Sequence, residues 1–133
     1  MIKQIAIFLE NQAGKASVCC KVLKDAGVNL NALSIADTKE FGILRIITDD
    51  NAKAMDALKA AGYLCSEVEL VGLEIPHESG ALADLLIALG EGGVNVEYMY
   101  SFATNGGVAE IAFKTAQAEK AVEILKAAGA KVV

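Results

Sequence analysis

The chain has 133 residues, of which 54% are hydrophobic and 22% charged, and its formal net charge is −5. This apolar content excludes a disordered chain, and the acidic balance, with Arg45 as the sole arginine, argues against nucleic acid, because phosphate binding needs clustered Lys and Arg. No apolar run approaches the ~18 residues that span a bilayer, and the start lacks a signal-peptide pattern, so we expect a cytoplasmic protein without membrane contact.

The first half of the chain predicts two helices among four strands. Residues 2–9 alternate as a half-buried strand does, and residues 15–27 change to helical spacing that ends at Gly27. Two further strands follow, over 28–36 and 42–48, joined by a short hairpin through Lys39 and Glu40. The half closes with a helix over 49–62, which ends at Gly62, and a strand over 63–70.

The second half predicts the same order of elements. Its strands are expected over 71–75, 94–103, 107–114 and 130–133, and its helices over 79–93 and 115–129. Asn105-Gly106 is a strong signal for a two-residue turn in the central hairpin.

An internal repeat supports this reading. DAGVNLNALSIADT (25–38), which ends at Thr38, aligns with EGGVNVEYMYSFAT (91–104), and ALKAAG (57–62) aligns with ILKAAG (124–129). We therefore predict an α+β fold of two domains, over residues 1–69 and 70–133. Each is a ferredoxin-like βαββαβ module, with an antiparallel sheet and helices on one face.

Each module contains one polar corner between its first strand and first helix. FLENQAG (8–14) reaches Gly14, and EIPHESG (74–80) reaches Gly80. A helix N-terminus leaves N–H groups unpaired and carries partial positive charge, so such a corner favours a small anion, and a carboxylate fits as well as a phosphate. Asn29 and Asn95 open the second strands at matching positions, which suggests a pocket with polar groups from both modules.

The stretches ENQAG, AGVNLNALSIAD and IPHESGALADLLIALGEGGVNVEYMY resemble the ACT domain, a small-molecule sensor attached to many enzymes of amino-acid biosynthesis. The resemblance covers the chain as two tandem ACT domains and looks closest to free-standing, amino-acid-binding members. It implies modules whose second strands extend one sheet, with an amino acid bound at their junction. The ligand-binding residues that it implies are Asn11, Gln12, Ala13, Gly14, Asn29, His77, Glu78, Ser79, Gly80 and Asn95.

The sequence departs from the family pattern at several of these positions. Ala13 and Ser79 stand where the family usually has proline, and Ala16 stands where it has leucine, which the second module keeps as Leu82. His77 replaces the usual loop asparagine. These departures leave open whether one or both corners bind.

We therefore expect an allosteric regulatory protein that senses a free amino acid. We further expect it to be no enzyme, without catalytic residues, cofactor or metal, to form a homodimer and to regulate a metabolic enzyme in trans. One alternative is an interaction subunit that binds no ligand. The other is a small hydrolase, but that chemistry needs an arginine in the first loop, and neither loop has one.

Three features that resemble metal or catalytic sites have simpler interpretations. Asp49 and Asp50 stand where a helix begins, so capping explains them without a metal. Cys19, Cys20 and Cys65 form no Cys-x-x-Cys pair, and we expect them to pack in or near the core. His77 has no partner at a spacing typical of a catalytic triad.

Overall fold

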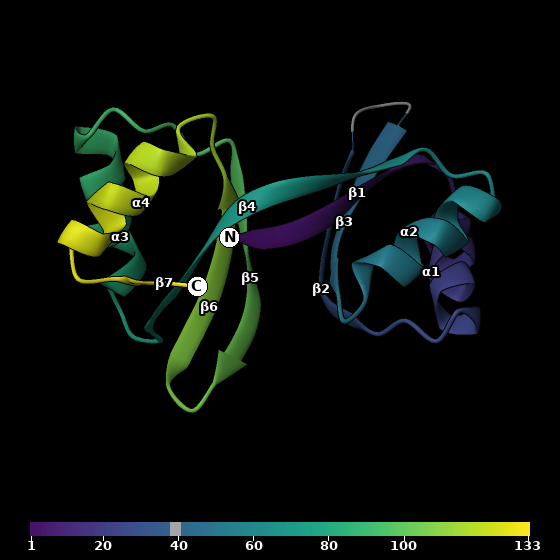
Figure 1. Cartoon of the computed structure of the whole chain (residues 1–133), viewed down its shortest axis with the longest axis horizontal. Helices are drawn as coiled ribbons and strands as arrows, with labels where there is room; N and C mark the ends of the chain where they lie inside the picture. The colour runs from purple at the N-terminus through teal and green to yellow at the C-terminus, as the bar shows by residue number, and fades with distance from the viewer. Residues whose placement is uncertain (38–40) are drawn as a thin grey trace. The chain divides into compact units, whose positions relative to one another are not determined.

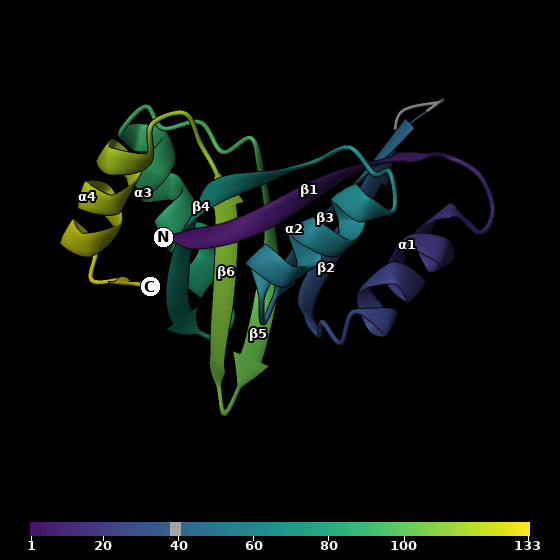
Figure 2. The same ribbon diagram turned by 45° about the vertical axis from the view of Figure 1, so that its right-hand side comes forward.

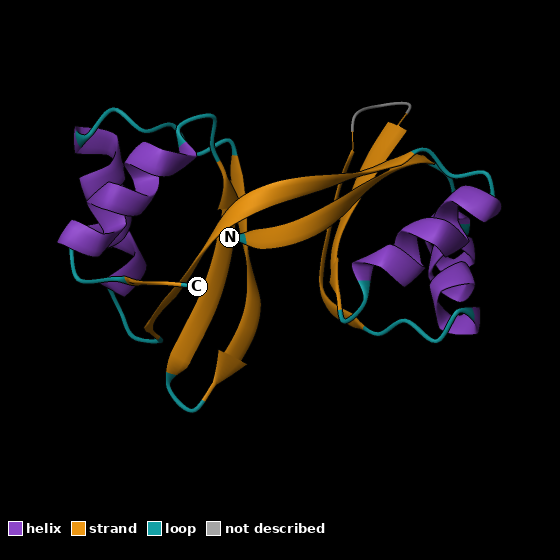
Figure 3. Cartoon of the chain, viewed as in Figure 1, coloured by secondary structure: helices purple, strands orange, loops and turns teal. Residues whose placement is uncertain are grey.

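The structure, a computed structural model, describes residues 1–37 and 41–133. The chain divides into two compact units (Figure 1). The N-terminal unit consists of Lys3–Val68, and the C-terminal unit consists of Glu69–Val133 together with Met1–Ile2. In each unit two helices lie on one side of the strands (Figure 3).

The N-terminal unit has the predicted βαββαβ order. Its elements are β1 (Ile2–Glu10), α1 (Lys15–Asp25), β2 (Leu30–Asp37), β3 (Phe41–Thr48), α2 (Asn51–Ala60) and the start of β4 (Cys65–Pro76). The strands lie in the order β2-β3-β1-β4, and β3 pairs antiparallel with both β1 and β2. This order, with both helices on one face, is the ferredoxin-like arrangement.

The C-terminal unit repeats that order. Its elements are the remainder of β4, α3 (Ala81–Glu91), β5 (Tyr98–Asn105), β6 (Val108–Lys114), α4 (Ala118–Ala127) and β7 (Lys131–Val132). Its strands lie in the order β7-β4-β6-β5, all antiparallel, and the β5–β6 hairpin is the green pair in Figure 2. The predicted fold, two βαββαβ modules in tandem, is therefore confirmed.

Each unit has its own hydrophobic core between sheet and helices, and matched positions of the repeat fill matched places. In the N-terminal core, Leu44 and Ile46 of β3 meet Leu58 of α2. In the C-terminal core the corresponding side chains are those of Ile111, Phe113 and Leu125. The alternation along the strands explains this, because every second side chain of each strand points towards the helices.

The prediction of two separate strands at the centre of the chain is wrong. Residues 63–70 and 71–75 were expected to form different strands, whereas β4 runs without interruption from Cys65 to Pro76. Leu70 and Val71 are consecutive in the chain and neither is a turn-forming residue, so nothing ends the strand between them. Gly72 lies within β4 because a Cβ at that position would collide with Ile2 and with Val133.

Glycines end the helices as predicted. Gly27 follows α1 with φ +74°, and Gly93 follows α3 with φ +76°. After α1 the N–H of Gly27 donates to the carbonyl of Lys24, and the N–H of Val28 donates to that of Leu23, both at 3.0 Å. This pair of hydrogen bonds satisfies carbonyls that the end of a helix leaves unpaired, and it needs a left-handed residue, which glycine adopts without strain.

The two hairpin predictions have different outcomes. The hairpin through Lys39 and Glu40, like Thr38 of the repeat, lies outside the described residues. The second hairpin forms, but its turn lies one residue later than predicted. Asn105 still pairs with Val108, and the turn residues are Gly106 and Gly107, with φ of +58° and +86°. Positive φ at both positions is the two-residue turn that matches strand twist, and two glycines adopt it more easily than Asn-Gly does.

Candidate ligand-binding site

The two corners share one backbone geometry. Gly14 precedes α1 with φ +85°, and Gly80 precedes α3 with φ +88°, and neither helix has a side chain that caps its first turn. A Cβ built at either glycine would meet no atom within 4 Å, so the backbone of both corners faces open space. The positive φ explains why glycine stands at both positions.

Each corner also presents unpaired N–H groups. The N–H of Lys15 donates to the carbonyl of Gln12 at 3.3 Å, and that of Ala81 donates to Glu78 at 3.4 Å. Within residues 1–37 and 41–133, the next two N–H groups of each helix have no backbone acceptor; they belong to Ala16, Ser17, Leu82 and Ala83. Together with the helix dipole they form a weak positive end that can bind a carboxylate.

A pocket of about 260 Å³ lies at the corner of the N-terminal unit. It is lined by residues from three strands, the loop and the first turn of α1, namely Leu9, Glu10, Asn11, Gln12, Ala16, Ile35 and Gly42. The strand register brings them together, because Gly42 of β3 pairs with Leu9 of β1 and Ile35 of β2 pairs with Leu44 of β3. The pocket thus has an apolar wall and a polar rim.

Of the predicted residues in this corner, the pocket includes Asn11 and Gln12. Both side chains are exposed, as are Ala13 and Gly14, which follow them in the loop but do not line the pocket. Glu10 forms an ion pair with Lys15 at 3.7 Å. Because both of these side chains are largely exposed, the pair is weak and leaves the Glu10 carboxylate available to a ligand cation.

The corner of the C-terminal unit carries different side chains. His77, Glu78, Ser79 and Gly80 are all exposed. The N–H of His77 donates to the carbonyl of Gly107 at 2.7 Å, so the turn of the β5–β6 hairpin holds the start of this loop.

Asn29 and Asn95 have a structural role in the backbone. The N–H of Asn29 donates to Oδ1 of Asp49 at 3.0 Å, and the N–H of Asn95 donates to Oε1 of Gln117 at 3.1 Å. In both units this bond ties the residue after Gly-Val to the segment before the second helix. Fold geometry therefore explains why the two asparagines recur. Both side chains are exposed, and Nδ2 of Asn29 donates to Oδ1 of Asn31 at 3.4 Å.

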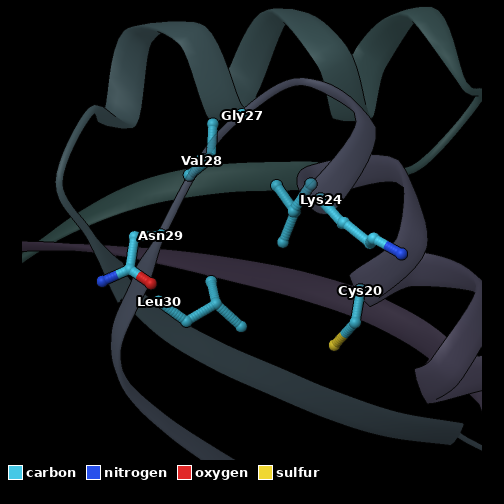
Figure 4. Close-up of a pocket in the computed structure, with 7 residues that line it drawn as sticks. Cys20, Lys24, Gly27, Val28, Asn29 and Leu30 are labelled. Carbon is cyan, nitrogen blue, oxygen red and sulfur yellow. The ribbon is translucent and has the colours of Figure 1, made fainter.

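Asn29 does not share the pocket of Asn11 and Gln12. It lines a wider, shallow hollow of about 470 Å³ at the end of α1, together with Cys20 and Lys24 (Figure 4). In that view Asn29 and Lys24 stand on opposite sides of the hollow.

Ile35 and Gly42 line the pocket, but the sequence did not predict them as site residues. They lie far from the loop in sequence and reach it through strand pairing, so no local pattern marks them. Ala16 could have been found from the sequence, because this small residue stands where the family usually has leucine.

The predictions about metal and cysteine residues also have structural outcomes. Asp50 caps α2, since its side chain accepts from the N–H of Lys53 at 3.0 Å, while Asp49 bonds to Asn29. In the part of the chain that the structure describes, no cluster of His, Cys, Asp and Glu could hold a metal ion. The three cysteines are free thiols; Cys19 is buried, and Cys20 and Cys65 are half-buried.

None of the helices within residues 1–37 and 41–133 combines the length and the apolar character that crossing a bilayer requires.

Known structures of similar fold include one clear relative. Protein BT0572 from Bacteroides thetaiotaomicron is 40% identical, with a TM-score of 0.91, and the match covers 99% of this chain and 91% of that one. The regulatory subunit of aspartate kinase from Thermus thermophilus, in its ligand-free form, is 16% identical, with a TM-score of 0.69 and coverage of 95% and 91%. The corresponding subunit from Thermus flavus is 18% identical, with a TM-score of 0.66 and coverage of 96% and 92%. The two Thermus subunits share the fold.

Among curated proteins, none matches this chain. The family described as the ACT domain pair matches residues 1–132, which is nearly the whole sequence. With two βαββαβ units and a 40% identical relative of the same fold, the chain belongs to the ACT domain pair family.

Proposed function

We propose that this chain is a regulatory protein that binds a free amino acid at the corner of its ACT units. The observation that carries this proposal is the pocket of about 260 Å³ that Asn11 and Gln12 line beside the first turn of α1. The aspartate kinase subunits of similar fold are described as regulatory, which supports a regulatory role in this chain too.

The chemistry of the corner suits a zwitterion. The N–H groups of Ala16 and Ser17 are available to the ligand's carboxylate at the positive end of α1. The amide oxygen of Gln12 and the carboxylate of Glu10 line the pocket and can accept from the ligand's ammonium group. A ligand that meets both sets of groups has its charges satisfied at opposite ends.

Binding becomes regulation when the ligand prefers one conformation. Its differential affinity for two states shifts their populations, and the coupling to a second site or partner is reciprocal. We propose that the partner is a metabolic enzyme regulated in trans, that the chain acts as a homodimer and that two ACT modules share the ligand. A ligand of about ten heavy atoms supports affinities on the order of micromolar to millimolar, which suits the sensing of metabolite pools.

A thermal-shift screen of the twenty amino acids tests the proposal. At about ten times its Kd a ligand stabilises the folded state by roughly 1.4 kcal/mol, which raises Tm by several degrees. We expect one or two amino acids to give such a shift, and the double variant Asn11→Ala/Gln12→Ala to lose most of it. The control Asp56→Ala changes an exposed side chain on α2 and should keep the full shift.

Two further variants test whether both modules contribute to the site. Asn29→Ala and Asn95→Ala remove side chains while keeping the backbone bonds to Asp49 and Gln117. If two modules share the ligand, at least one of these variants should reduce the shift. A flat response of the wild type to all twenty amino acids would refute the sensor proposal in favour of an interaction subunit that binds no ligand.

A further inference from the structure

The two corners differ at the positions that decide how much space they enclose. Ala16, two residues after Gly14, corresponds to Leu82, two residues after Gly80. Gly42, which pairs with Leu9, corresponds to Ala109, which pairs with Ile75 at the same place in the sheet. The small residue of each pair is in the N-terminal unit.

In the N-terminal unit both small residues border open space. Ala16 and Gly42 line the pocket of about 260 Å³, and the side chain of Ile35 faces it from the edge strand β2. Ala16 packs against the core of the N-terminal unit as Leu82 does against that of the C-terminal unit, so the two corners differ here in side-chain size. Leu82 is half-buried against the core cluster, and Ala109, only 6% exposed, belongs to it. A third pair of matched positions also differs. Ile35, which pairs with Leu44 in the N-terminal unit, corresponds to Ser101, which pairs with Ile111 in the C-terminal unit.

We propose that the two ACT units are unequal: the N-terminal unit supplies the pocket that holds an α-amino acid with an aliphatic side chain, and Leu82 and Ala109 fill the equivalent pocket of the C-terminal unit. This inference rests on the proposed function and goes beyond it in naming the unit that binds and the class of ligand.

The lining of the pocket selects the ligand class. The apolar wall of Leu9, Ala16 and Ile35 offers no partner to a charged side chain, so burying one there would be costly. Glu10 at the rim repels an acidic side chain further.

Gly42 permits a variant that changes the pocket and little else. A Cβ at Gly42 would lie 3.7 Å from the carbonyl oxygen of Ala36, 3.9 Å from Cγ1 of Ile35 and 4.0 Å from the carbonyl oxygen of Leu9. These are ordinary van der Waals contacts, and φ at Gly42 is not positive. Gly42→Ala should therefore fold normally and add one methyl group to the pocket.

The test is isothermal titration of the full chain with L-leucine, L-isoleucine, L-aspartate and L-lysine. We expect one aliphatic ligand per chain, with aspartate and lysine at least tenfold weaker. Gly42→Ala should weaken aliphatic binding several-fold. Ala16→Leu/Gly42→Ala, which copies the C-terminal corner, should weaken it at least tenfold. The matched control Leu82→Ala, in the other unit, should keep the wild-type affinity. Circular dichroism checks that each variant is folded.

Each result separates this inference from the proposed function. Two ligands per chain, or loss of binding in folded Leu82→Ala but not in Ala16→Leu/Gly42→Ala, would overturn the unequal pair. Tighter binding of aspartate or lysine would overturn the aliphatic class. Both results leave amino-acid sensing intact, whereas failure of all twenty amino acids to bind would overturn the sensing function itself.

Discussion

Cys19 lies on the inner face of α1 with its side chain fully excluded from solvent, beside the half-buried Cys20. Burial, together with smaller effects of the neighbouring Cys20 and Cys65, raises the pKa of the Cys19 thiol from its ordinary 9.0 to about 11. Burial also raises the pKa of the Cys65 thiol. Cys19 is therefore a neutral, packed side chain at physiological pH, as the sequence predicted.

The raised pKa of Cys19 predicts a loss of stability in alkali. Above pH 9.0 the unfolded chain releases the thiol proton while the folded chain retains it, so the free energy of unfolding falls until about pH 11. The difference between a pKa of 9.0 in the unfolded chain and about 11 in the folded chain corresponds to a loss of unfolding free energy on the order of 2 kcal/mol. Urea titrations at pH 8 and pH 10.5 measure it, with Cys19→Ala as the comparison. Equal alkaline losses in the two proteins would contradict this assignment to Cys19.

At the scale of elements, glycine has two different roles that a sequence alone does not separate. Gly27 ends α1 in the left-handed region, whereas Gly90 lies inside the last turn of α3 with ordinary helical geometry. A Cβ at Gly90 would meet no atom within 4 Å, and one at Gly27 would lie 3.5 Å from Nζ of Lys53. The backbone conformation, and not the space around the side chain, therefore decides how alanine changes stability at each position.

Gly27→Ala and Gly90→Ala should change stability in opposite directions. Alanine at Gly27 must adopt a left-handed conformation, so we expect a loss of about 1 kcal/mol. At Gly90 alanine restricts the unfolded chain and favours the helix, so we expect a gain of up to ~1 kcal/mol. Thermal or urea unfolding of the two variants gives both values. A stabilised Gly27→Ala variant would show that the turn after α1 tolerates another conformation.

The sequence predicts elements better than it predicts the pocket. The ends of α1 and α2 could be predicted, because Gly27 and Gly62 mark them locally in the sequence. The unbroken β4 was missed because no local feature distinguishes one long strand from two short ones. Ile35 and Gly42 were missed because pairing across β3 brings them to the loop, and the register becomes visible only once the sheet is formed.

At the scale of the whole molecule, the two units are joined by strands as well as by sequence. β4 contributes Cys65–Val68 to the N-terminal unit and Glu69–Pro76 to the C-terminal unit. β1 begins at Ile2 in the C-terminal unit and continues in the N-terminal one. Because both strands continue from one unit into the other, we expect the loss of either unit to disturb strands of both and unfolding to be a single cooperative transition.

Cys19 can report this coupling, because it is buried in the N-terminal unit. In a Cys20→Ala/Cys65→Ala background it is the sole thiol, and the rate of its labelling by an excess of thiol reagent follows the opening of that unit. Leu125→Ala removes a fully buried side chain from the C-terminal core and should cost at least about 2 kcal/mol. If the units unfold together, Cys19 labelling accelerates roughly 30-fold.

Two controls at matched positions complete this experiment. Leu58→Ala makes the corresponding change in the N-terminal core and should accelerate Cys19 labelling whether or not the units are coupled. Glu123→Ala changes an exposed side chain on α4 and should leave the rate unchanged. If Leu125→Ala left the rate at the wild-type value while Leu58→Ala raised it, each ACT unit would unfold alone. The shared strands would then transmit no stability from one ACT unit to the other.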